Sequence, residues 1–257
     1  MKGLIIKDLM CLRKQLIIFA YVVAGVLVVS IMFVLSARFG NIALGNQEMM
    51  VENGLSDIDI NNMSTQVLMM FMLLPVACVG DFAKIFEEDG KAEFVKVSSV
   101  MPLSIGQRVM AKFITIFAMF GMGAGTDLVI AFILSKLTNI ISFMDFLGII
   151  ISAVSLMSIF GALVIVLCFV FGYGKEDYSR IIALLIMLVT ALFANITKIK
   201  ALFRAITLGD NTEIDFFTDF IEYFKCKSYM LFLIAMITII VSYFVSVFVA
   251  KRKRGVV

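Results

Sequence analysis

The sequence has no histidine and no tryptophan, and only two of its 257 residues are proline. Without histidine the chain cannot build a Ser-His-Asp or Cys-His nucleophile, an HExxH zinc site or a histidine-ligated haem site. These absences exclude most hydrolases and metalloproteases. An intramembrane protease is excluded too, since the apolar segments also lack a paired acidic site.

Charge and cysteine motifs are scarce as well. Charged residues make up 16% of the chain, and the net charge of +3 is too small to indicate a nucleic-acid partner. The four cysteines form no CxxC pair. There is no GxxxxGK[ST] motif, and the nearest fragment, residues 172–175, lacks the first glycine and the hydroxyl residue. We therefore expect no cofactor, no metal and no enzyme activity in this chain.

Apolar residues are in excess, at 62%, against about 45–50% in an ordinary soluble domain. They concentrate in continuous segments, and about 20 such residues cross a bilayer as a helix. We expect a single-domain, all-α polytopic membrane protein over residues 1–257, lying in the plasma membrane. Its six predicted spans are 16–35, 67–80, 109–134, 146–171, 181–194 and 229–250; the second and fifth are short.

The distribution of lysine and arginine predicts the orientation. With the N-terminus inside, 15 of these residues fall on the cytoplasmic side and 7 on the outer side, as the positive-inside rule requires. An even number of spans also brings both basic ends of the chain to one side. The N-terminus does not resemble a signal peptide, because Lys7, Asp8 and Arg13 interrupt its apolar residues. The prediction is N-in/C-in.

Two segments outside the spans have amphipathic patterns. Residues 1–15 place apolar side chains at helical spacing, which predicts an interfacial helix or, alternatively, an extension of the first span. Residues 196–228 predict one or two short extracellular helices, separated by the Gly209-Asp210-Asn211 turn.

The connection between the second and third spans, residues 81–108, has more structure than a simple loop. Ile85 and Phe86 precede an acidic cluster, Gly90 permits a break, and Pro102 with Ser104 can start a short helix that runs into the third span. This pattern predicts a surface that docks another protein. The alternative is a helical extension with no partner.

Within the spans, Asp127 is the ionisable residue that stands out. It either lines a cavity and contacts a cation, or lies near the outer end of its span and reaches headgroup water. Gly121 and Gly125 form a GxxxG pair that favours helix packing. The second span has a group of methionines, which could contact a hydrophobic substrate but equally suit contacts with lipid or helix packing. The candidate cavity-lining residues are therefore Asp127, Met69, Met72 and Pro75.

The start MKGLIIKDLMCLRKQ and the stretch FEEDGKAEFVKVSSVMPLSIGQRVMAKF resemble the permease subunit of ABC-2 type exporters, in particular the short six-span permeases of Gram-positive bacteria. Phe94 stands where many relatives have tryptophan. The resemblance implies a second permease copy or a homologous permease, two copies of a separate ABC ATPase that holds ATP and Mg, and the cell membrane of a Gram-positive bacterium. Relatives export phenol-soluble modulins, lantibiotics and other amphipathic peptides.

In that family the N-terminal helix and the helix after the second span contact the ATPase. Carried over to this chain, the docking residues are Glu87, Glu88, Asp89, Lys91, Pro102, Leu103, Ser104, Ile105, Gln107 and Arg108. The resemblance thus implies export of an amphipathic peptide, or of a drug-like or lipid-like molecule. The alternative is an ATP-independent secondary transporter or a membrane assembly factor, although a secondary transporter would favour internal repeats and several ionisable residues near the midplane.

Overall fold

The computed structural model describes residues 2–39, 74–78, 84–92, 103–138, 143–172, 174–194 and 216–254. Every secondary-structure element in these ranges is a helix. The helices are α1 (Lys2–Cys11), α2 (Arg13–Phe39), α5 (Leu74–Cys78), α6 (Lys84–Lys91), α8 (Ile105–Thr138), α9 (Phe143–Phe171), α10 (Glu176–Ala194) and α12 (Phe216–Arg254). The prediction of an all-helical protein is confirmed for these ranges.

Four helices are long and apolar enough to cross a membrane: Arg13–Ser36, Ile105–Lys136, Phe146–Phe171 and Cys226–Lys253. They correspond to the first, third, fourth and sixth predicted spans. Of the predicted second span, the described residues include only 74–78, which form α5. The predicted fifth span lies in α10, whose 19 residues reach about 28 Å at 1.5 Å per residue. Six spans remain a prediction.

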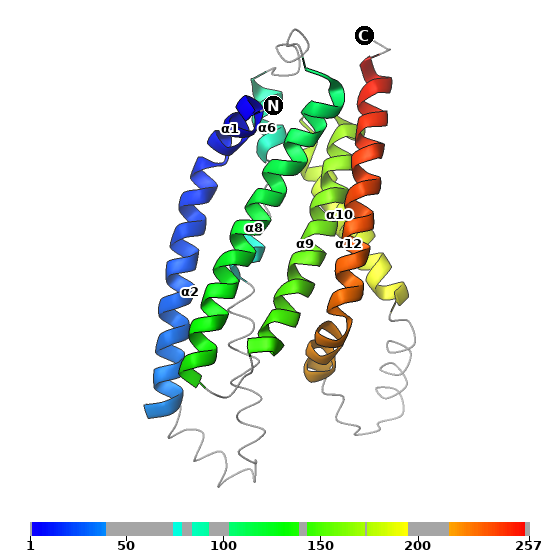
Figure 1. Ribbon diagram of the computed structural model, residues 1–257. Helices are drawn as coiled ribbons and strands as arrows, with labels where there is room; N and C mark the ends of the chain where they lie inside the picture. Colours follow the sequence, from blue (N-terminus) through cyan, green and yellow to red (C-terminus); the bar gives the residue numbers. More distant parts are fainter. Residues whose placement is uncertain are drawn as a thin grey trace.

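The helices form an elongated bundle with α1 and the C-terminal end of α12 at the same end (Figure 1). This arrangement agrees with an even number of crossings. At that end also lie α6 and the first turns of α8 (Figure 1). We call this region the polar end, because the charged residues of α1, α6 and the start of α8 meet there.

Two apolar clusters hold the bundle together. The one nearer the polar end joins α1, α2, α6, α8, α9, α10 and α12; its largest buried side chains are Phe86, Phe120, Leu12, Ile85, Ile116 and Ile165. The other joins α2, α8 and α9 further along the bundle through Val26, Val34, Ile130, Ala131, Leu134, Phe146, Ile149 and Ile150. The most extensive helix pair is α9 with α12, and both helices carry buried serines.

The structure corrects one prediction about short helices and refines another. Residues 216–228 do not form a separate extracellular helix but are the first part of α12; residues 196–215 lie outside the described ranges. The helix that was predicted to start at Pro102 and Ser104 and to run into the third span is the first part of α8, which begins at Ile105. The physical reason is the same at both places, because no proline or paired glycine separates either segment from the span that follows.

The N-terminal segment combines the two alternatives that its sequence left open. Leu12 separates α1 from α2 as a single turn residue. The backbone is bridged across this point, since Leu12 N–H donates to Asp8 O at 3.2 Å and Leu16 N–H donates to Leu12 O at 2.9 Å. α1 is therefore a distinct helix that is directly coupled to the first span.

Candidate functional site

Helix α6 has an inner and an outer face with opposite character. Ile85, Phe86 and Asp89 are buried against the bundle. On the outer face, the side chains of Glu87 and Glu88 are 39% and 41% exposed, and Lys91 is 62% exposed. Lys91 pairs with Glu87 at 2.5 Å and lies 3.6 Å from Glu88. The predicted docking residues of α6 are thus divided, with Asp89 pointing inward.

The start of α8 is fixed by a reciprocal cap. Ser104 Oγ accepts a hydrogen bond from the backbone N–H of Gln107 at 3.2 Å, and Gln107 Oε1 accepts one from the backbone N–H of Ser104 at 3.1 Å. This is a capping box, which satisfies two backbone donors at a helix start. Arg108 donates to the carbonyl oxygen of Leu103 at 3.1 Å. Pro102 lies outside the described residues.

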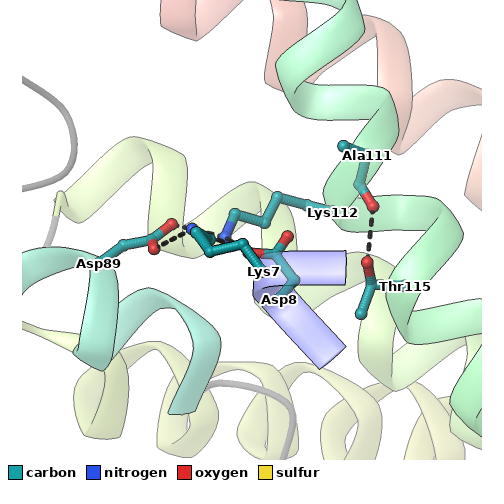
Figure 2. A network of polar contacts seen from close by, with 6 residues as sticks. All are labelled: Lys7, Asp8, Asp89, Ala111, Lys112 and Thr115. Atoms are coloured by element: carbon teal, nitrogen blue, oxygen red, sulfur yellow. Dashed lines mark hydrogen bonds and ion pairs between the residues drawn. The ribbon is translucent and has the colours of Figure 1, made fainter. Parts of the chain in front are cut away.

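The inner face of α6 is bound to two other helices by a cluster of four charged residues, which we call the ion cluster: Lys7, Asp8, Asp89 and Lys112. Lys112 Nζ donates to Asp8 Oδ1 at 2.8 Å and to Asp89 Oδ2 at 2.5 Å. Lys7 Nζ donates to Asp89 Oδ1 and lies 2.9 Å from Asp8 Oδ1. In Figure 2 the two ammonium groups lie between the two carboxylates, which come from α1 and α6.

The ion cluster is buried but electrically balanced. Asp8, Asp89 and Lys112 are 1%, 3% and 7% exposed, and two lysines offset two aspartates. Burial lowers the pKa of Lys7, but its hydrogen bonds to Asp89 and Asp8 outweigh that effect and raise the pKa above the ordinary value. Removing one partner from such a group leaves an uncompensated buried charge, which costs about 3–5 kcal/mol.

Aromatic contacts extend this link to a fourth helix. The ammonium group of Lys112 lies 5.5 Å from the centre of the Phe86 ring, within cation–π range. The same ring meets Phe169 on α9 edge to face, with centroids 5.6 Å apart. One turn below Lys112, the Thr115 hydroxyl donates to the Ala111 carbonyl oxygen at 3.0 Å (Figure 2). A movement of α6 is therefore resisted by α1, α8 and α9 together.

Sequence reasoning missed the roles of Lys7, Asp8 and Lys112. Asp8 lies one turn from both Leu4 and Leu12, which are the buried residues of the same face. That position within an apolar face was a readable sign of a buried carboxylate. Lys112 likewise lies between the buried residues Val109 and Ile116 of α8, although its sequence position suggests only a basic residue that enters a span.

Asp127 is 0% exposed, so its side chain does not reach headgroup water in this structure. It lies beside the backbone of Val76 on α5. That backbone group acts on the carboxyl group as a hydrogen-bond donor, but no described side chain pairs with either carboxylate oxygen. Pro75 of the same candidate set is also buried on α5, whereas Met69 and Met72 lie outside the described residues.

The glycine pair predicted for packing lies on an open face of α8. A Cβ added at Gly121 or Gly125 would meet no described atom within 4 Å. These glycines therefore form no close contact with the described helices, and their role in helix packing stays a prediction. The described residues also hold no group of three or more Cys, Asp or Glu that could bind a metal ion.

A comparison with protein-family models matches residues 56–252 to the model described as "ABC-2 family transporter protein". The match covers the polar connection before the third span, the ion-cluster residues Asp89 and Lys112, and all later helices up to Arg252. No match was found among curated proteins or among solved structures.

Proposed function

The chain belongs to the ABC-2 family of transporter proteins, and on this premise we propose that it is the membrane subunit of an ATP-driven exporter. A separate ATPase subunit, present in two copies, supplies the energy. A second permease copy or a homologous permease completes the transport path. The substrate is an amphipathic peptide or another hydrophobic molecule, moved out of the cell. In this arrangement the chain contributes no ATP site of its own.

The observation that carries this proposal is the division of α6 into two faces. The inner face is fixed to α1 and α8 through the ion cluster. The outer face presents charged side chains that the bundle does not use for its own packing. A soluble partner that binds the outer face of such a helix can displace it. The contacts of the inner face then transmit that displacement to the spans.

The ends of the neighbouring helices support the same location for the partner. Glu87 lies near enough to Arg180 of α10 for attraction between the two charges to lower the pKa of Glu87, although the hydrogen bond to Lys91 contributes more. At the C-terminal end of α9, Lys253 donates to the carbonyl oxygen of Val170 at 2.8 Å. The polar end is thus one connected surface rather than a set of independent loops.

Purification from native membranes distinguishes this proposal from an ATP-independent transporter or assembly factor. The exporter hypothesis predicts a stoichiometric soluble ATPase in the purified material, identified by mass spectrometry, and ATP hydrolysis that increases when amphipathic peptide is added. A chain purified intact and active in transport without any associated ATPase, in several mild detergents, would favour a secondary transporter.

A further inference from the structure

Asp127 lies deep in α8, far from both polar boundaries of that helix. Lys112 is 15 residues before it and Lys136 is 9 residues after it, which correspond to about 22 Å and about 14 Å along the helix axis. Its side chain is fully buried, although α8 as a whole qualifies as a membrane span. A carboxyl group at such a place is rare and normally has a functional role.

The described helices around Asp127 contribute mainly apolar side chains. On α8 it lies one turn before Ile130 and Ala131, which belong to the second apolar cluster. The short helix α5 packs against α8, α2 and α9, and places the buried residues Pro75 and Val76 at this level. On α2, Ser30 lies one turn from both Val26 and Val34 of the same cluster, and its buried hydroxyl has no hydrogen-bond partner.

No basic residue of the described helices is placed to neutralise the carboxylate. The chain has no lysine or arginine between Lys14 and Arg38, between Arg38 and Lys84, or between Lys136 and Lys175. On α5 and on α9 from residue 146 onward, the titratable groups are Cys78 and Cys168 alone. The two lysines and the one aspartate of α1 belong to the polar end, and the charged residues of α12 lie before Ser228 or after Ala250.

An ionised carboxylate in this position would be an uncompensated charge in an apolar medium, which the protein avoids by binding a counter-ion or a proton. Ca²⁺ and Mg²⁺ are poor candidates, because they take six or more oxygen ligands. Among the described side chains that lack a hydrogen-bond partner, the hydroxyl of Ser30 is the one that lies between residues of the same apolar cluster. A proton needs no further ligand.

We propose that Asp127 is a proton-binding site inside the membrane bundle, loaded in the closed packing of α5 against α8 and emptied when that packing opens to water. The proton comes from water and returns to it, with no other bond made or broken. Acidic conditions therefore favour the closed packing, and alkaline conditions favour the opened one. The inference needs only the helical bundle, so it does not depend on the proposed ATPase partner.

Infrared spectroscopy of the purified protein in lipid nanodiscs tests this directly, because a protonated carboxyl group has a carbonyl band separate from those of ionised carboxylates and amides. At neutral pH we expect one such band in the wild type that is absent in Asp127→Asn and shifted in Asp127→Glu. The matched control is Asp177→Asn, which removes an exposed acid on α10 and should leave the band unchanged.

The alternatives give different spectra. A wild-type spectrum without a carboxylic-acid band at neutral pH overturns the proposal, since Asp127 would then be ionised. A band that neither substitution at Asp127 alters overturns it as well, because another residue would hold the proton. If Asp127→Asn fails to fold, the shift in Asp127→Glu and the disappearance of the wild-type band on raising the pH decide the matter.

Discussion

Asp89 is buried against α8 and Asp127 is buried on it, and the protein treats these two carboxyl groups in opposite ways. Asp89 meets two ammonium groups, those of Lys7 and Lys112, at the polar end. Asp127, further along the same helix, meets none among the described residues. Both are almost completely shielded from solvent, so the difference lies in their partners and not in their burial.

The difference follows from where a membrane protein can place lysine. Near the boundary a lysine can bury its ammonium group beside a carboxylate while its flanking residues still meet water. In the middle of a span a lysine would itself need a partner. The buried charges at the polar end are therefore balanced by ion pairs that connect three helices. The interior carboxyl group of Asp127 is instead neutralised by a proton and forms no ion pair between helices.

The largest expected effect is that of Lys112→Met. This substitution leaves the carboxylates of Asp8 and Asp89 with Lys7 alone, and breaking a buried group of this kind costs about 3–5 kcal/mol. We expect a large loss in the free energy of unfolding, measured by denaturant titration in detergent. Lys91→Met on the exposed face of α6 is the control and should change the stability little.

A double-mutant cycle shows whether the loss comes from the ion cluster. Asp8→Asn combined with Lys112→Met should cost less than the sum of the two single changes, because the residues are in direct contact. Strict additivity would contradict the pairing of these side chains.

The next effect compares the two carboxyl groups directly. Asp89→Asn removes a charge that two lysines require, so we expect a loss of about 3 kcal/mol or more. Asp127→Asn replaces one neutral group by another of the same size if Asp127 carries a proton, and we expect a loss of about 1 kcal/mol or less. Equal losses in the two variants would show that the two carboxyl groups are in the same charge state.

A smaller effect should appear at high pH. Because the pKa of Lys7 is raised above its ordinary value of 10.5, the folded state holds this proton more tightly than the unfolded state does. Its stabilisation is complete below about pH 10.5 and is lost as the pH rises through the folded-state value. Thermal unfolding measured across that range should show this decline in the wild type and a weaker one in Lys7→Met.

The smallest effect concerns the outer face of α6. The hydrogen bond between Lys91 and Glu87 lowers the pKa of Glu87. Because both side chains are solvent-exposed, salt screens the pair. We expect Glu87→Gln to leave the unfolding temperature unchanged within error at physiological salt. A clear loss of stability would mean that this face is needed for folding and is not free to dock a partner.

The sequence correctly predicted the local helix features of the polar end. Apolar residues at helical spacing correctly indicated that Ile85 and Phe86 face the bundle. The start of a helix near Ser104 was also recognisable, since its side chain and that of Gln107 have the spacing of a capping box. These features depend on residues within a few positions of one another, which is what periodicity and capping rules report.

The ion cluster could not be predicted in the same way. Its pairs join residues 82 and 104 positions apart in the chain, and no local pattern specifies which lysine meets which aspartate. Asp89 was grouped with Glu87 and Glu88 because the three are adjacent, yet the helical turn directs it to the opposite face. For Asp127, the sequence showed an ionisable residue within an apolar span, but only the fold showed its complete burial.

The most direct test of the account is ATP hydrolysis by the complete transporter with the outer face of α6 reversed, in Glu87→Lys/Glu88→Lys. Lys136→Glu, a charge reversal at the far end of α8, is the control. The account predicts a folded, membrane-inserted permease that no longer retains or stimulates its ATPase, while the control retains both. A Glu87→Lys/Glu88→Lys permease with wild-type ATPase association and stimulation would contradict docking on α6.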